Sequence, residues 1–154
     1  MPDWLTHSLI GWITGKTTKQ DIALVVIGSL IPDLVKINLL FTWLHIADHQ
    51  FFEPLHTPIG ALLVTGIVAL CFQEPKKAVL PLGIGVLTHF TLDFFLVHTQ
   101  PVLRLLFPFS WDGWQVSLIR SDDYMVTIVA VLAALFIYGL YWIAARRKKQ
   151  QAVH

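Results

Sequence analysis

Long apolar runs separated by short polar stretches dominate the chain. The clearest run covers residues 124–145, YMVTIVAVLAALFIYGLYWIAA, which contains no charged residue and is followed directly by Arg-Arg-Lys-Lys at 146–149. About 20 apolar residues span the hydrocarbon core of a bilayer, and a basic cluster anchors the cytoplasmic end of such a helix. This run predicts a transmembrane helix, and a buried helix of a soluble protein is the less favoured alternative.

Three further runs are candidate spans with polar or helix-breaking interruptions: residues 78–97, 57–72 and 22–44. The first is long enough but contains His89 and Asp93, the second is a little short, and the third is broken by Pro32. The opening run, residues 4–14, is too short to span and predicts a partly inserted helix. The expected fold is therefore an all-α, polytopic transmembrane bundle of about four spans with a short N-terminal helix.

The stretch 99–123 is interrupted by Pro and Gly but rich in Phe, Trp and Leu. Such a composition predicts an interfacial segment that lies on the membrane surface or caps the bundle. The expected organisation is one integral-membrane helical domain over residues 1–145 and a basic, flexible cytoplasmic tail over residues 146–154.

Composition narrows the class of protein. Apolar residues make up 55% of the 154 residues and charged residues 14%, whereas an average soluble domain has about 25% charged residues. A disordered chain, a coiled coil and an ordinary soluble α/β enzyme are excluded. The net charge of +1 provides no basic field for nucleic acid. The single cysteine, Cys71, allows neither an intramolecular disulfide nor a cysteine-type zinc site.

The distribution of basic residues predicts the orientation in the membrane. Short loops rich in Lys and Arg stay in the cytoplasm. Eight of the 11 positive charges lie in the 15–20 loop, the 73–77 loop and the C-terminal tail: Lys16, Lys19, Lys76, Lys77 and the four basic residues at 146–149. We therefore expect an integral inner-membrane protein whose C-terminus is cytoplasmic, surrounded by membrane lipid.

Ionisable residues inside apolar runs are costly in hydrocarbon, so they are usually paired or line a site. His89 and Asp93 are spaced i, i+4, which places both on one face of a helix. The imidazole and the carboxylate either bind one metal ion together or form a hydrogen bond only with each other. Asp33, after Pro32, is either a ligand or the N-cap of a helix beginning near Leu34.

His7 and His56 are each unremarkable alone, but the set changes the interpretation. His7, Asp33, His56, His89 and Asp93 come from four separate segments, and the expected orientation places them all toward the outer half of the bundle. Imidazoles and carboxylates suit a divalent metal, with zinc favoured and manganese or iron also suitable. Without a usable cysteine, the set indicates a catalytic site. Asp33, Glu53 and His49 are the candidates for catalytic proton transfer, and whether His45 joins them stays open.

At these residues the sequence resembles the LexA-binding, inner-membrane-associated hydrolases, also called membrane-bound metal-dependent hydrolases. The resemblance rests on an early histidine followed by four motifs in order: His7, LIPD at 30–33, LHTPIG around His56, THFTLD at 88–93 and PVLRLLFPFSW at 101–111. The family often continues Pro-Asp-x-Asp-His, whereas residues 34–36 here are Leu-Val-Lys. The resemblance implies a metal-dependent hydrolase of the inner membrane.

Three functions compete on this sequence. The favoured one is a membrane-embedded hydrolase in which metal-activated water attacks a phosphoester or other ester, with a lipid-linked molecule as substrate. The alternative is a non-catalytic membrane adaptor whose His and Asp side chains join helices, and whose protein partner, LexA included, would bind the cytoplasmic loops or tail. A transporter is disfavoured because about four spans without an inverted repeat leave little room for alternating access.

Overall fold

The computed structural model describes residues 4–37, 41, 43, 44, 52–97, 103–114, 116, 118–120 and 124–151. The α-helices with defined first and last residues are α1 (Trp4–Thr18), α2 (Ile22–Leu30), α4 (Pro58–Ala69), α5 (Pro75–Phe95) and α6 (Met125–Gln151). Two 3-10 helices, η1 (Pro32–Lys36) and η2 (Glu53–His56), and two strands of two residues each complete the described elements. The predicted all-helical class is confirmed.

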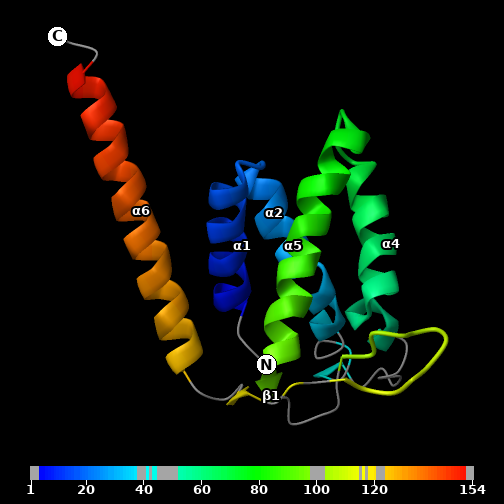
Figure 1. Cartoon of the computed structure of the whole chain (residues 1–154). Coiled ribbons are helices and arrows are strands. Elements are labelled where there is room, and N and C mark those ends of the chain that lie inside the picture. The colour runs from blue at the N-terminus through cyan, green and yellow to red at the C-terminus, as the bar shows by residue number, and fades with distance from the viewer. Residues whose placement is uncertain are drawn as a thin grey trace.

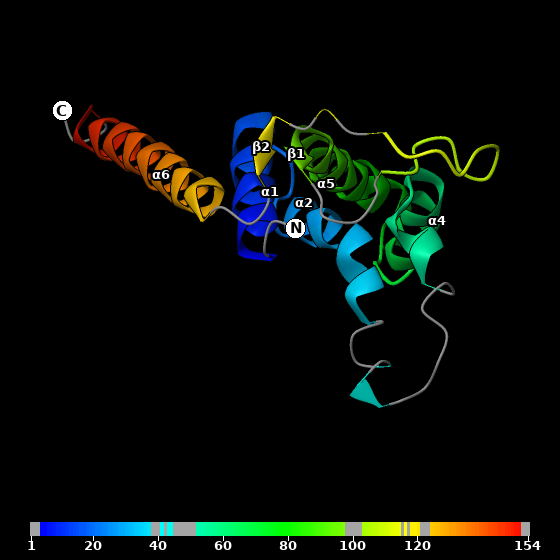
Figure 2. The same ribbon diagram turned by 90° about the horizontal axis from the view of Figure 1, so that it is seen from below.

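Helix α5 is the centre of the bundle. It packs against α1 and α2 on one side and against α4 on the other (Figure 1, Figure 2). The buried core around it includes Leu82, Val86 and Phe90 from α5 and Ala61 from α4. Helix α6 contacts α1 and leans away from the other helices (Figure 1).

Glycines let the backbones of α2 and α5 approach closely. A Cβ atom at Gly28 of α2 would lie 2.1 Å from the carbonyl oxygen of Leu82, and one at Gly85 of α5 would lie 2.1 Å from the carbonyl oxygen of Val25. Contacts that short are forbidden, so these positions admit no larger side chain without a shift of the helices. The same contact brings the C-terminal end of α2 against the last turns of α5.

The expected number of spans needs correction. Among the described residues, only α5 and the Met125–Lys148 part of α6 are long and apolar enough to cross a membrane. The predicted 22–44 span is instead a nine-residue α2 followed by η1, because Pro32 cannot donate to the helical ladder. The predicted 57–72 span is a 12-residue α4. Helix α1 is longer than the predicted 4–14, at 15 residues.

Helix α6 confirms the strongest predicted span and extends it. Most of its apolar side chains are exposed, including Leu132, Leu135 and Phe136. The helix continues past residue 145 through the basic cluster to Gln151, so it does not end at the predicted boundary between domain and tail. Arg, Lys and Gln are good helix formers, which explains why the helix continues.

The basic connections lie at one end of the molecule. The α1–α2 connection, the α4–α5 connection and the C-terminal end of α6 point the same way (Figure 1). This is the grouping that the predicted orientation requires, while the side of the membrane that they face stays a prediction. At the opposite end, β1 (Leu96–Val97) pairs in parallel with β2 (Ile119–Arg120), and Leu103 bridges to Trp114. Leu103 is buried in the core, so this part of the predicted interfacial segment covers the end of the bundle.

Candidate metal centre

Four separate elements meet at the end of the bundle opposite the basic connections. They are the start of α1, η1, η2 and the last turns of α5 (Figure 1). They carry the five predicted ligands: His7, Asp33, His56, His89 and Asp93. All except His56 are buried, and the His56 side chain is 13% exposed.

Local structure explains how two of these residues are presented. Thr57 is the N-cap of α4, and its hydroxyl accepts a hydrogen bond from the Gly60 N–H at 3.1 Å. This cap ends η2 and holds His56 just before the helix. Asp33 lies inside η1, whose N-cap is Ile31 without a side-chain hydrogen bond, so the interpretation of Asp33 as a cap is wrong.

Three imidazoles surround the carboxylate of Asp93. Its Oδ2 lies 3.0 Å from Nε2 of His56 and 3.2 Å from Nε2 of His89, and its Oδ1 lies 3.5 Å from Nε2 of His7. The two Nε2 atoms of His56 and His89 are themselves 3.3 Å apart. Asp93 is therefore the centre of the cluster, and the predicted i, i+4 pair with His89 is one contact among several.

The possible ligand atoms form two overlapping groups. One contains His56, His89 and Asp93 and the other His7, Asp33 and His89; within each group the atoms lie within 4.8 Å of one another. His89 belongs to both groups, so all five residues converge on one region. Each group has the spacing that an ion shared by its three residues needs, and binding of an ion stays a prediction.

The hydrogen bond on the far side of His89 determines which ring nitrogen carries a hydrogen. Nδ1 of His89 lies 2.7 Å from the backbone carbonyl oxygen of Ser29. A carbonyl oxygen only accepts, so Nδ1 donates. A neutral His89 therefore directs the lone pair of Nε2 toward Oδ2 of Asp93, which is also an acceptor. Two acceptors 3.2 Å apart repel unless a proton or a cation lies between them.

His7 adds a second polar atom that fits an ion. Its ring stacks on that of His89, with centroids 3.8 Å apart and an interplanar angle of 15°. Its Nδ1 is buried and has no hydrogen-bond partner within the described part of the chain. Buried polar nitrogens are rarely left in this state, so this region suits a ligand that accepts lone pairs.

Lys36 lies in the same region, although an ammonium group is not a metal ligand. Its Nζ lies 2.6 Å from Oδ2 of Asp33, and its side chain is 18% exposed. The i, i+3 spacing of the two residues was visible in the sequence and is a usual signal for an ion pair on a helix. The backbone carbonyl of Ser29, by contrast, had no sequence signal at all.

Of the predicted proton-transfer residues, Asp33 belongs to the cluster, whereas Glu53 does not. Glu53 lies in η2 and forms an ion pair with Arg104, and neither ligand group includes it. This ion pair ties η2, and with it His56, to the segment that follows α5. His49 and His45 lie outside the described residues.

Comparison with known proteins agrees with a membrane location. The family model of the YdjM inner membrane protein matches residues 3–153. This chain belongs to that family. Comparison with curated proteins and with solved structures gives no match. Together with the two long apolar helices, the family supports the predicted inner-membrane association; its name does not address LexA binding, hydrolysis or metal.

Proposed function

We propose that this chain is a membrane-embedded, metal-dependent hydrolase of phosphoesters or other esters, with its C-terminus in the cytoplasm. The observation that carries the proposal is the contact between Nε2 of His89 and Oδ2 of Asp93. Because Nδ1 of His89 donates to the carbonyl of Ser29, the lone pair of Nε2 points into the cluster. Backbone carbonyls orient the imidazole ligands of metal sites in the same way.

The donor set suits a catalytic ion. His7, His56, His89, Asp33 and Asp93 would hold it, and imidazole with carboxylate is a ligand set for zinc, with manganese or iron as further choices. When bound, such an ion lowers the pKa of a coordinated water toward ~7 and polarises an ester oxygen.

The residues of the cluster and its neighbours have separate roles in this proposal. The buried His7, His89 and Asp93 would keep bulk water from the inner side of the site, while the partly exposed His56 leaves one side open to substrate. Glu53 and Arg104 hold η2 in place, so His56 stays aligned with Asp93. Asp33, Glu53 and His49 remain the proposed residues for proton transfer.

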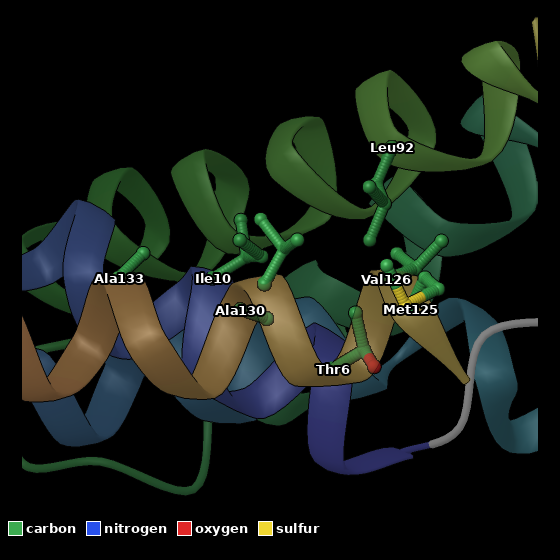
Figure 3. Close-up of a pocket in the computed structure, with 8 residues that line it drawn as sticks. Thr6, Ile10, Leu92, Met125, Val126, Ala130 and Ala133 are labelled. Atoms are coloured by element: carbon green, nitrogen blue, oxygen red, sulfur yellow. The ribbon is translucent and has the colours of Figure 1, made fainter.

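An apolar crevice beside the cluster supports a lipid-linked substrate. It opens between α1, α5 and α6 and has a volume of about 310 Å³ (Figure 3). Thr6 and Leu92, which line it, directly adjoin His7 and Asp93 in the chain. An acyl or isoprenoid chain placed there would keep the ester end of the molecule close to the cluster.

The adaptor hypothesis is favoured by one observation. Asp93 joins three elements through direct contacts to His7, His56 and His89, and such contacts stabilise a membrane bundle without an ion. In that hypothesis the Nε2–H of His56, 3.0 Å from Oδ2 of Asp93 and 3.3 Å from Nε2 of His89, lies between these two acceptors in place of an ion. Metal content therefore separates the two functions.

The decisive experiment is elemental analysis of detergent-purified protein. We expect a stoichiometric transition metal in the wild type and at least a tenfold loss in Asp93→Ala and His89→Ala, because even outer-shell partners change metal affinity by about 10- to 100-fold. Asp112→Ala, which removes an exposed carboxylate near the same end, is the matched control and should keep the metal. A metal-free wild type would leave the adaptor hypothesis in place.

A further inference from the structure

The ammonium group of Lys36 lies at the partly exposed edge of the cluster. Its partner Asp33 is buried, and the two form the 2.6 Å ion pair described above. Lys36 also lies beside the ring of Trp4, with Nζ 5.9 Å from the ring centroid. The ammonium is thus held in a defined position from two sides.

Exposure shows from which side a substrate approaches. The side chains of His7, His89 and Asp93 are at most 2% exposed. His56 at 13% and Lys36 at 18% are the members of this region that solvent or a headgroup reaches. A molecule that enters therefore meets the ammonium before it meets the buried ligands.

Charge balance favours an anion at this point. Asp33 and Asp93 together carry two negative charges, which a divalent ion neutralises if the three imidazoles are neutral. The ammonium of Lys36 then leaves the loaded site with a net positive charge. In a poorly solvated region an uncompensated charge is costly, so the binding of an anionic ligand is favoured.

Other cations do not take this role among the described side chains. Arg104 is paired with Glu53, and its guanidinium lies 4.9 Å from the ring centroid of Trp111. Lys16 and Lys77 belong to α1 and α5 at the opposite, basic end of the molecule (Figure 1). Lys36 is therefore the described cation that both touches a clustered carboxylate and remains accessible.

We propose that Lys36 is a substrate-binding residue that holds an anionic oxygen of the substrate, so that the substrate is a phosphate ester and not a neutral ester. This inference rests on the proposed function, since it assumes an ion in the cluster. A phosphate group belongs equally to a lipid headgroup and to a soluble phosphate ester, and two probes distinguish these sources. One is inorganic phosphate, and the other is dodecyl phosphate, which carries the same group on an apolar chain.

The experiment measures phosphate binding in the detergent-purified, Mn²⁺-loaded protein through paramagnetic relaxation of the ³¹P signal. We expect Lys36→Gln to weaken binding of inorganic phosphate about 10-fold or more, as the loss of a hydrogen bond to a charged group implies, and Lys36→Arg to keep most of it. Lys77→Gln is the matched control, because Lys77 forms the same i, i+3 ion pair with Glu74 at 2.8 Å but is exposed and far from the cluster. Tighter binding of dodecyl phosphate than of inorganic phosphate, still dependent on Lys36, would assign the lipid source, and equal binding the soluble one.

The outcomes separate the two proposals. Equal phosphate affinity in wild type and Lys36→Gln, with equal Mn²⁺ content, overturns the role of Lys36 and leaves the hydrolase proposal standing. Failure of the wild type to bind Mn²⁺ or zinc overturns both.

A second measurement uses only the wild-type protein, in case Lys36→Gln loses the ion or does not fold. Phosphate should slow acetylation of Lys36 by acetic anhydride, read by peptide mass spectrometry, while Lys77 reacts at an unchanged rate. Equal rates at Lys36 with and without phosphate would contradict the proposal.

Discussion

Helices α5 and α6 are both long and apolar enough to cross a membrane but have opposite surroundings. The most apolar window of α5 is 44% buried inside the protein, whereas that of α6 is 11% buried. Helix α5 carries His89 and Asp93, and the apolar part of α6 carries no charged residue. The difference teaches that a helix in the middle of a bundle can hold ionisable groups because its neighbours supply partners, while a helix facing lipid cannot.

Glycine usage follows the same division. Gly85 in α5 is in contact with the backbone of α2, whereas a Cβ atom at Gly139 in α6 would meet no atom within 4 Å. Helix α5 is therefore built for close packing beside the cluster, and α6 for anchorage in the membrane.

The largest expected difference concerns stabilisation by metal. Zinc at 100 times its dissociation constant should stabilise the wild type against unfolding by about 2.7 kcal/mol, and Asp93→Asn in α5 should lose this gain. Leu132→Ala removes an exposed side chain of α6 and should keep it. Thermal unfolding in detergent, with zinc and with a chelator, measures both. An unchanged zinc response in Asp93→Asn would place the ion elsewhere.

A smaller difference is expected for the two glycines. Gly85→Ala should destabilise the bundle by about 1–3 kcal/mol, because the new methyl group collides with the carbonyl of Val25. It should also weaken metal binding, since the α2–α5 contact holds the Ser29 carbonyl against His89. Gly139→Ala should be neutral or stabilise α6 by up to about 1 kcal/mol. Urea unfolding of both variants tests the pair, and equal destabilisation would contradict the division between the helices.

The smallest effect is expected where α6 joins the bundle. The hydroxyl of Thr127 in α6 lies 2.9 Å from that of Thr6 in α1. Thr127→Val should cost about 0.6 kcal/mol, the typical value for one interhelical hydrogen bond in a membrane protein. Metal content should stay at the wild-type level, and a loss of metal in Thr127→Val would show that α6 supports the cluster after all.

The prediction of helices succeeded where hydropathy and length agree. The uncharged run that became α6 and the run containing His89 both form long helices, since a helix satisfies every backbone group within its own segment. The number of spans was wrong because hydropathy does not report where a helix stops. Pro32 ended one predicted span, and the other ended at Ala69, well short of a bilayer's thickness.

The sequence alone determined the helical class, the strongest membrane-spanning helix and the residue types able to bind a metal, because local composition and spacing carry that information. Only the tertiary structure decided that residues from four segments converge, that the carbonyl of Ser29, 60 positions from His89, orients its ring, and that Lys36 is partly exposed beside them. Those facts depend on how α2 packs against α5, a long-range contact that no periodicity encodes.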